Sequence, residues 1–506
     1  MLNLLDRYLD GITMYKVMLY GLLLLAGIAI LFGFFDLLHY KGYQYIISFS
    51  MVLGICWIVN YLFAKLYSVP TNSESSLITG LILFFLLSPF EAIDQIPFYI
   101  AAGFLSMGSK YILALHRKHI FNPAAFAAFI LGLFGSPLVI WWIGSLVMLP
   151  FVTILGIAIL RKTRRFRMFF IFITAAIFTV LSISLYHSYP LSDVAAQLFM
   201  SWPIVFFGTV MLTEPLTTPP TNRLRIIYAT LVGVLFGSQF HIGFLFASPE
   251  LALLIGNIYS YIVSSKQKLL LNLQEKKQIA RDMYEFLFIP KGNFTYMPGQ
   301  YMEWTLPHKN VDIRGNRRYF TVASSPTEAT LRLGVKVIQN GSSFKKNLIA
   351  MDEKSFILAG QLSGDFTLPK DASKKLVFLA GGIGITPFRS MIKYLVDKNE
   401  KRDITLLYSN KTADEIVYKD VFDEAEKKLH IKTIYTITDK EHLPENWNGE
   451  KGRVDAAMIQ KYIPDYKERV YYISGPHIMV TAYEDILKNL GISSSHIIID
   501  YFPGFV

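Results

Sequence analysis

The stretch LVFLAGGIGITPF, from Leu376 to Phe388, decides the fold of the C-terminal part of the chain. A run of apolar residues of strand length leads directly into a glycine cluster and then into Thr-Pro. In a doubly wound α/β sheet, ligands bind beyond the carboxyl ends of the strands, where a helix N-terminus presents unpaired N–H groups to an anion. The stretch therefore predicts a strand, a phosphate-binding turn and a helix.

Gly381, Gly382 and Gly384 carry no Cβ, so a pyrophosphate and a nicotinamide ribose can approach the backbone closely. We expect Thr386 to cap the following helix and Pro387 to fit its first turn. A Gly-Gly-x-Gly turn also occurs for purely structural reasons, so the surrounding sequence has to decide.

The surrounding sequence has two different patterns of apolar and polar residues. Before this stretch, KQIARDMYEFLFIP and TLRLGVKVI alternate, with Gly and Pro between them, which is typical of antiparallel strands and predicts a small antiparallel β-barrel over 266–372. After Ser373, strand-like runs alternate with helical ones, which predicts a doubly wound α/β domain over 373–506.

Composition separates these domains from the first half. Of the 506 residues, 53% are hydrophobic and 17% charged, which is too apolar for an ordinary soluble protein. Charges are sparse up to Ser264 and reach the density of soluble proteins from Lys266 onward, so we assign 1–265 to a polytopic membrane domain. The single cysteine, Cys56, excludes a disulfide within the chain and any iron-sulfur cluster held by its own thiolates.

Apolar runs of helix length predict about ten membrane spans. They cover 17–38, 45–64, 77–89, 97–115, 123–135, 138–160, 168–187, 195–213, 224–247 and 249–264. The third and fifth runs are short, and such segments are often re-entrant. If these two did not span, HRKH at His116–His119 would move outside, so we favour ten.

Charge placement predicts the orientation. With ten spans and a cytoplasmic N-terminus, the basic residues of the first half gather in the inside loops, and the outside loops hold mainly acidic residues. We therefore expect a multi-pass protein of the cytoplasmic membrane with both termini in the cytoplasm. The formal net charge of +11 does not indicate nucleic-acid binding, because the basic residues of the first half lie at the ends of apolar runs, where they mark membrane orientation. We therefore expect no nucleic acid as a partner.

Two stretches of the membrane half are distinctive: HIFNPAAF (His119–Phe126) and MLTEPLTTPPTNRLRIIYA (Met211–Ala229). Each alone reads as a helix boundary, with Asn122 and Pro123 as N-cap and first-turn residues. Together they resemble the NqrB/RnfD family of membrane proteins, which belong to the sodium-translocating NADH:quinone reductase and to the Rnf complex, over roughly residues 15 to 264. The resemblance implies ten spans and an electron-carrying flavin within the membrane.

The membrane half departs from that family at one point. Its members usually attach FMN to the Thr of a Ser-Gly-Ala-Thr-like motif, and no such tetrapeptide occurs in this half; YAT at Tyr228–Thr230 lacks the small residues before it. A membrane flavin would therefore be held noncovalently. Haem is an alternative carrier. His39, His187 and His241 all fall toward the outer face, which suits at most one haem between His187 and His241.

Two further stretches point to FAD. In RYFTVASSP (Arg318–Pro326), Arg318 offers a guanidinium to a diphosphate, Phe320 a ring to the flavin and Thr321 a hydroxyl near flavin N5; Tyr319 lies within the motif. In NGSSFKKNL, small residues and N–H groups at a helix start suit phosphate. Those residues are Gly341, Ser342 and Ser343.

These pieces, in this order, resemble the ferredoxin-NADP reductase superfamily of FAD enzymes over roughly residues 268 to 506. The resemblance maps the family's Cys-Gly-Pro onto Ser474, Gly475 and Pro476, where Ser for Cys leaves a small polar group near the nicotinamide C4. It maps the terminal Phe-x-Gly onto Phe502 and Gly504, with Asp500 in the place of an acidic residue near the flavin.

Coenzyme choice stays open between NADH and NADPH. Ser409, Asn410 and Lys411 follow the second strand of the α/β domain, where a 2′-phosphate would lie, and Lys411 either pairs with it or is a solvated loop cation.

The sequence thus predicts an NAD(P)H-dependent FAD oxidoreductase fused to a membrane domain, with Thr321 and Ser474 as catalytic residues. Its partners are the lipid bilayer, NAD(P)H and a membrane acceptor, either a bound flavin or a quinone. One alternative is a reductase of diffusible acceptors whose membrane half is a transporter or anchor. Another is a haem-containing ferric reductase.

Overall fold

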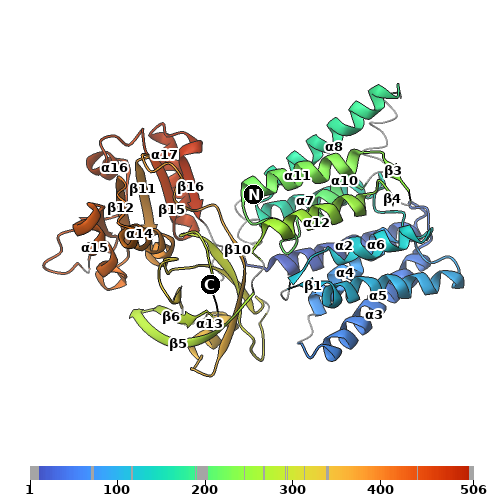
Figure 1. Ribbon diagram of the computed structural model, residues 1–506, viewed down its shortest axis with the longest axis horizontal. Helices are drawn as coiled ribbons and strands as arrows, with labels where there is room; N and C mark the ends of the chain where they lie inside the picture. Colours follow the sequence, from blue (N-terminus) through green and yellow to red (C-terminus); the bar gives the residue numbers. More distant parts are fainter. Residues whose placement is uncertain are drawn as a thin grey trace. The chain divides into compact units, whose positions relative to one another are not determined.

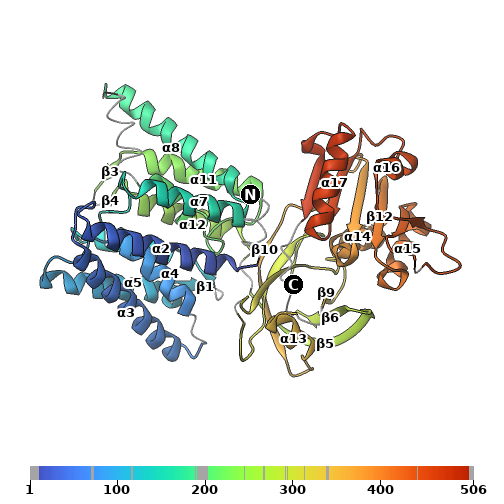
Figure 2. The ribbon, with the colours of Figure 1, turned by 180° about the vertical axis from the view of Figure 1, so that it is seen from behind.

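The computed structural model describes residues 11–69, 73–115, 118–188, 190, 203–243, 245–265, 268–290, 292, 294–312, 314–337, 341–441 and 443–500. The chain divides into two compact units, Met1–Lys266 and Gln267–Val506 (Figures 1 and 2). The first unit is helical, and the second contains two six-stranded sheets.

The described part of the first unit consists of helices and two short antiparallel hairpins (Figure 1). The helices are α2 (Met14–Phe34), α3 (Gly42–Leu66), α4 (Ser73–Leu86), η1 (Ile93–Gln95), α5 (Ile96–Ile112), α6 (Pro123–Leu133), α7 (Leu149–Thr163), α8 (Phe166–Tyr186), α10 (Ile204–Phe206), the π-helix η2 (Phe207–Met211), α11 (Asn222–Gly237) and α12 (Pro249–Val263). The hairpins pair β1 (Ala114–Leu115) with β2 (Lys118–His119), and β3 (His241–Ile242) with β4 (Leu245–Phe246).

Among the described residues, three helices are long and apolar enough to cross a membrane by length and composition: α2, α3 and α8. Glu74–Leu86, Pro123–Leu133 and Pro249–Val263 are apolar but shorter. Each of the ten apolar runs contains helix, yet ten complete spans remain a prediction.

Two of the expected spans are interrupted. In the run 138–160, helix α7 begins only at Leu149, because Val139 pairs with Leu87 as an isolated bridge and Trp141 donates its backbone N–H to the carbonyl of Leu86. Pro150 lies in the first turn of α7, where its missing N–H costs nothing. In the run 224–247, α11 ends at Gly237 and the hairpin β3–β4 follows.

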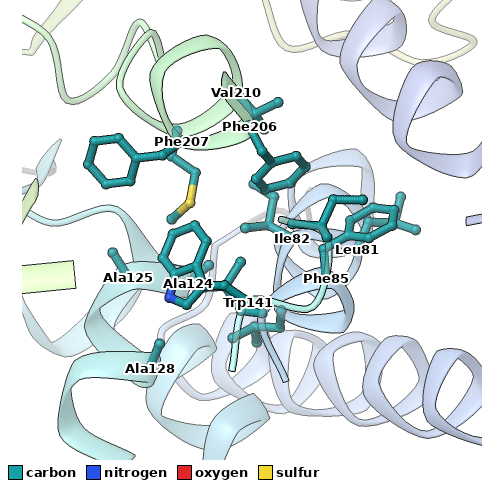
Figure 3. Close-up of a cluster of buried hydrophobic side chains, with 14 of the residues drawn as sticks. Leu81, Ile82, Phe85, Ala124, Ala125, Ala128, Trp141, Phe206, Phe207 and Val210 are labelled. Atoms are coloured by element: carbon teal, nitrogen blue, oxygen red, sulfur yellow. The ribbon is translucent and has the colours of Figure 1, made fainter. Parts of the chain in front are cut away.

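One buried cluster shows how the helical unit packs. Side chains of α4, α6 and the α10–η2 segment meet around the ring of Trp141 (Figure 3). Alanines of α6 line one side of this cluster, and Phe207 lies 6.1 Å from Trp141 between ring centroids. Small residues on α6 therefore leave room for the large aromatic side chains that face them.

The first sheet of the second unit is antiparallel, in the order β8-β7-β10-β5-β6-β9. Its strands are β5 (Leu269–Ala280), β6 (Met283–Ile289), β7 (Tyr301–Thr305), β8 (Arg317–Thr321), β9 (Leu331–Lys336) and β10 (Phe356–Ser363), and the short helix α13 (Ser343–Ile349) packs on its core. The Ala323 N–H, just past β8, donates to the Arg332 carbonyl in β9 at 2.9 Å, which links the two edge strands. The antiparallel strands are as predicted; closure into a barrel stays a prediction.

The second sheet is parallel throughout, in the order β14-β13-β12-β11-β15-β16. Its strands are β11 (Leu376–Gly381), β12 (Ile404–Asn410), β13 (Lys432–Ile437), β14 (Glu450–Lys451), β15 (Val470–Ser474) and β16 (Ile497–Asp500). Its helices are η3 (Gly382–Ile385), α14 (Thr386–Lys398), η4 (Ala413–Glu415), α15 (Lys419–Leu429), α16 (Ala456–Tyr462), α17 (His477–Asn489) and η5 (Ser494–His496).

Alternate residues of β11 pack against helices on opposite faces of this sheet. Phe378 belongs to the core formed with α14 and α15, whereas Leu379 belongs to the core formed with α16 and α17. The sheet is therefore doubly wound, as the alternating strand and helix runs predict. Strand order reverses between β11 and β15, which makes the ends of these two strands the place where a ligand would bind.

Candidate functional site

Two loops meet at the point where the strand order reverses. Ala380 of β11 is in register with Ser474 of β15, so the glycine turn after β11 and the Ser-Gly-Pro loop after β15 lie side by side. A Cβ on Gly384 would lie 2.5 Å from the Gly475 Cα and 2.5 Å from the Ser474 carbonyl oxygen. Gly384 is thus required by the packing of the two loops, besides any need for close approach of a ligand.

Thr386 does not cap α14. The 3-10 turn η3 (Gly382–Ile385) runs directly into the helix, so Ile385 takes the N-cap position and Thr386 is the first helical residue. Its hydroxyl donates to the carbonyl of Ile383 at 3.2 Å, so the capping prediction is wrong. Pro387 does lie in the first turn of the helix, as predicted.

Ser474 is buried at the end of β15, and the glycine that follows it packs against a methionine that no sequence pattern indicated. The side chain of Met479, in α17, covers both Gly381 and Gly475 so closely that a Cβ on either would collide with it. Pro476 is the N-cap residue of the same helix. The predicted nicotinamide residues of the two loops are therefore brought together, with Met479 packed behind them.

The predicted flavin residues Arg318, Tyr319, Phe320 and Thr321 lie in β8. Arg318 and Thr321 are buried, whereas Tyr319 is exposed and its hydroxyl donates to a Glu303 carboxylate oxygen at 3.0 Å. Phe320 is half-buried.

The guanidinium of Arg318 joins the two FAD motifs. It lies 5.2 Å from the ring centroid of Phe344, in α13, and donates to the carbonyls of Arg314, Gly315 and Arg317 at 2.6 to 3.1 Å. The motif in β8 and the motif that begins α13 thus lie together, although they are separated in sequence.

Ser343 is held by a loop that the sequence motifs do not include. Its hydroxyl lies 3.1 Å from His308 Nε2 and accepts the Asp312 N–H at 3.0 Å, while its own N–H donates to Asp312 Oδ2 at 2.8 Å. Ser342 is the N-cap residue of α13 and accepts the Lys345 N–H at 3.4 Å, with Gly341 immediately before it. No local pattern in the sequence marks His308 or Asp312.

Positive charge is crowded beside Ser343. Burial, and then the neighbouring Arg318 and Arg314, lower the pKa of Lys345 to about 8. The pKa of Arg318 is lowered to about 10, by burial first and by Arg314 despite the opposing carboxylate of Asp312. Burial alone would raise the pKa of Asp312, but hydrogen bonds from Ser343 and Arg314 outweigh it and lower the pKa. Three mutually repelling cations share this place with one carboxylate, so the residues fit a diphosphate.

Thr321 connects the two sheets. Its hydroxyl donates to Asp500 Oδ2, at the end of β16, over 3.4 Å. The two predicted residues Phe502 and Gly504, which follow Asp500 in the chain, lie outside the described residues.

The residues predicted for the coenzyme's adenosine end lie where β12 ends. Ser409 is in register with Gly381, and Asn410 is buried with its carbonyl accepting the Thr438 N–H at 2.9 Å. The Lys411 N–H donates to Glu415 Oε2 at 3.2 Å, and the other oxygen of that carboxylate pairs with Lys336 at 3.0 Å. The loop carries both signs of charge, and the choice between NADH and NADPH stays open.

In the helical unit, the two distinctive stretches touch each other. Asn122 caps α6, as predicted, by accepting the Ala125 N–H at 3.1 Å. Its amide nitrogen donates to Glu214 Oε2 at 2.9 Å, and Thr217 donates to the same oxygen at 3.2 Å. His119 lies 3.9 Å from Glu214 Oε1. Both stretches are therefore helix boundaries joined by polar bonds.

The histidines of the haem alternative lie at the ends of helices and in a hairpin. His187 follows α8 and lies against Tyr186, and His39 lies against Tyr40. His241 lines a cavity of about 540 Å³ together with Phe236, Phe240 and Phe246. Among the described residues, no group of three or more His, Cys, Asp and Glu side chains is placed to hold a metal ion.

The matches to known proteins fall in the second unit. The family of oxidoreductase NAD-binding domains matches residues 378–485. The chain is 26% identical over 208 residues to the glycine betaine monooxygenase reductase subunit of Chromohalobacter salexigens, which covers 40% of this chain and 55% of that protein. It is 27% identical over 214 residues to an NADPH oxidoreductase of Mycobacterium tuberculosis, covering 41% of this chain and 53% of that protein.

Among solved structures, the FAD/NAD-binding domain of a nitric oxide dioxygenase from Vibrio cholerae is 18% identical, with a TM-score of 0.41, covering 46% of this chain and 97% of that chain. The chain spans about half the length of the curated relatives it matches.

The second unit is thus ferredoxin-NADP reductase-like, with an oxidoreductase NAD-binding domain over residues 378–485, and its relatives support an NAD(P)H-dependent FAD oxidoreductase. The family match lies wholly within this unit, so the resemblance of residues 15 to 264 to the NqrB/RnfD family remains a prediction.

Proposed function

We propose that this chain is a membrane-bound flavoprotein oxidoreductase that takes hydride from NAD(P)H onto FAD and passes the electrons to a membrane acceptor, either a bound flavin or a quinone. The observation that carries the proposal is the meeting of Arg314, Arg318 and Lys345 beside Ser343. Beyond the effect of burial, Arg314 lowers the pKa of both Arg318 and Lys345, and Arg318 lowers the pKa of Lys345 further, so an anion bound beside them would be stabilised. The diphosphate of FAD is such an anion.

In this proposal, each predicted residue has a defined task. Arg318 and Lys345 hold the diphosphate, and Gly341, Ser342 and Ser343 approach it with small side chains and backbone N–H groups. Phe320 packs on the flavin ring, with Tyr319 as its exposed neighbour in the strand. When bound, FAD supplies a ring that accepts a hydride and releases electrons one at a time.

The coenzyme is held at the carboxyl ends of β11 and β15. Gly381, Gly382 and Gly384 form the turn that the coenzyme approaches, with Thr386 and Pro387 in the first turn of α14 beneath it. The room for its pyrophosphate and ribose is at Gly382, because the Cβ directions of Gly381 and Gly384 are filled by Met479 and Gly475. Gly475 and Pro476 form the facing loop. Ser474 places a hydroxyl next to the nicotinamide, and Thr321 places one next to the flavin. Ser409 and Asn410 lie at the adenosine end.

The apolar composition of α2, α3 and α8 supports a membrane location. In the proposal both termini are cytoplasmic, which rests on the placement of the basic residues in the sequence. A membrane flavin would be noncovalent, since the attachment motif is missing from the first half. The alternatives are a reductase of diffusible acceptors whose membrane half is a transporter or anchor, and a ferric reductase with a haem between His187 and His241.

Cofactor analysis of the purified, detergent-solubilised chain separates these functions. The proposal predicts one FAD per chain plus either a second flavin or NAD(P)H-dependent reduction of a quinone. One flavin per chain with reduction only of water-soluble acceptors supports the anchored reductase. A Soret band supports the haem protein, and a chain without flavin contradicts the proposal.

A further inference from the structure

Helix α14 is fastened to the loop 322–330, which follows the flavin strand β8. Ser390 donates from its hydroxyl to the Ser324 carbonyl at 2.6 Å. Arg389 donates to the Ala323 carbonyl at 3.1 Å, and Thr327 donates to Asp397 at 2.5 Å. Side chains from one face of α14 thus bind successive positions of a single loop.

Arg389 also forms a bidentate ion pair with Glu328, in the same loop. Both terminal nitrogens of Arg389 donate to the carboxylate of Glu328, one of them over 2.9 Å. Arg389 is only 4% exposed. A planar guanidinium fixes a carboxylate in direction as well as in distance, which an ammonium group does not.

The ion pair is itself held in place from the antiparallel sheet. Arg332, in β9, binds Glu328 at 3.1 Å and Glu285, in β6, at 2.7 Å. Burial would raise the pKa of Glu328, but its bonds to Arg389 and Arg332 and from the Ser325 N–H outweigh burial and lower the pKa. The chain of alternating charges therefore runs from the antiparallel sheet into α14.

The position of these contacts gives them a function. Ala323 lies two residues beyond Thr321, the hydroxyl residue of the flavin strand. Arg389 lies three residues beyond Thr386, in the helix that the coenzyme turn opens. The contacts therefore tie together the two segments whose separation sets the distance between the hydride donor and the hydride acceptor.

We infer that Arg389 is a positioning residue for hydride transfer: through Glu328 and the Ala323 carbonyl, it fixes the nicotinamide-binding turn relative to the flavin strand. The inference rests on the proposed function. Glu328 and Ala323 are not among the residues predicted to bind FAD or NAD(P)H, so the effect of Arg389 falls on geometry rather than on binding.

Arg389→Lys is the variant that tests this inference. Lysine keeps the charge but cannot bind the Glu328 carboxylate and the Ala323 carbonyl with a fixed fork. We expect the rate of flavin reduction by saturating NAD(P)H to fall about ten- to a hundredfold, since misplacement of reacting groups by about 1 Å costs about that much. FAD content should stay at the wild-type level, and the apparent Kd for the coenzyme should change less than about threefold.

A second readout does not depend on turnover. Hydrogen exchange of the loop 322–330 should become faster in Arg389→Lys without added coenzyme. In this loop the N–H groups of Val322 and Ala323 donate to the carbonyls of Gln300 and Arg332, and these bonds should open more often when Arg389 no longer holds the loop. Glu328→Gln should show the same pattern, which covers the case in which Arg389→Lys fails to fold.

Arg402→Lys is the matched control. The Arg402 side chain is 7% exposed, against 5% for Arg389, and it binds a carboxylate, Glu400, and a backbone carbonyl, Pro369, both outside the loop 322–330. It should keep the wild-type rate of flavin reduction. The inference is overturned if Arg389→Lys and Glu328→Gln fold and both keep the wild-type rate of flavin reduction and the wild-type exchange of the loop. It is also overturned if Arg402→Lys loses as much of the rate of flavin reduction as Arg389→Lys does. A wild-type chain without FAD, or without reaction with NAD(P)H, overturns the proposed function instead.

Discussion

The hydroxyl of Thr321, at the end of β8, donates to the carboxylate of Asp500, at the end of β16, over 3.4 Å. This bond joins the edge of the antiparallel sheet to the edge of the parallel sheet, across 179 positions of sequence. Asp500 is 8% exposed, so both partners are shielded from bulk water. The proposed catalytic hydroxyl is thereby oriented by a residue of the coenzyme domain.

Thr321→Val tests the role of this hydroxyl. Valine keeps the shape of the side chain but can donate neither to Asp500 nor to a flavin nitrogen. We expect flavin reduction to slow by about a hundredfold, within the range for loss of a group that transfers or holds a proton. Rapid-mixing absorbance measures the rate. Thr321→Ser, which keeps the hydroxyl, should stay within about threefold of the wild type, and equal rates for the valine and serine variants would remove the role.

Arg318→Ala tests the FAD site directly. The guanidinium supplies the charge that lies over Phe344 beside Ser343, so its loss should leave the purified chain without FAD and without NAD(P)H oxidation. Flavin absorbance per chain is the measurement. Arg317→Ala is the control, because Arg317 neighbours Arg318 in sequence but pairs with Glu303 at 3.7 Å, and it should keep its FAD. Full activity of Arg318→Ala would remove the assignment.

Lys345 should make FAD binding sensitive to alkaline pH. Its pKa in the folded protein is lowered from 10.5 to about 8. Below about pH 8 the folded protein therefore carries a lysine charge that destabilises it. This destabilisation is lost as pH rises from about 8 toward 10.5, because the folded lysine loses its proton first. A bound diphosphate favours the charged lysine, so binding takes up a proton above about pH 8. Affinity for FAD should therefore fall as pH rises through 8, by at most about tenfold per pH unit.

Lys345→Gln provides the test of that pH dependence. The variant should bind FAD about ten- to a hundredfold more weakly at pH 7, the usual loss for a hydrogen bond to a charged group, and should show no fall between about pH 8 and 10. Fluorescence quenching of added FAD gives both affinities. Lys346→Gln, on the exposed side of the same short helix, should behave like the wild type. An unchanged pH profile in Lys345→Gln would contradict the assignment.

Gly384→Ala should disable the coenzyme site through packing. A Cβ at this position would lie 2.5 Å from the Gly475 Cα, and backbone cannot move aside as a side-chain tip can. We expect a loss of about 1–3 kcal/mol in the free energy of unfolding, together with a raised KM for NAD(P)H. Thermal unfolding and steady-state kinetics measure the two effects. Gly360→Ala is the control, since its nearest neighbour is a side-chain carbon at 3.4 Å, and equal effects at both positions would contradict the argument.

The helices and strands of the second unit were predictable because the apolar residues of each one repeat with the spacing of its own secondary structure. The alternation of KQIARDMYEFLFIP became the hairpin β5–β6, and the run LVFLAG became a strand buried on both faces. The contact between Gly384 and Gly475 was not predictable, because it exists only after β11 and β15 pair. The sequence pattern therefore explained the glycine by ligand approach alone.

Errors and omissions elsewhere also have physical causes. The sequence Gly-Ile-Thr-Pro does not reveal that a 3-10 turn runs into α14, so Thr386 was expected one position outside the helix. Lys345 was overlooked because a helix as short as α13 does not show which of two adjacent lysines faces Arg318. The run 138–160 is apolar enough for a span, but its first residues, Leu138–Trp141, pair with the end of α4 instead.

The central claim is that the chain carries FAD that NAD(P)H reduces. Anaerobic addition of NADH or NADPH to the purified chain, followed by flavin absorbance, tests it most directly. We predict about one FAD per chain that bleaches fully with one equivalent of the preferred coenzyme. A chain that retains no FAD, or whose FAD stays oxidised with both coenzymes, would contradict the account.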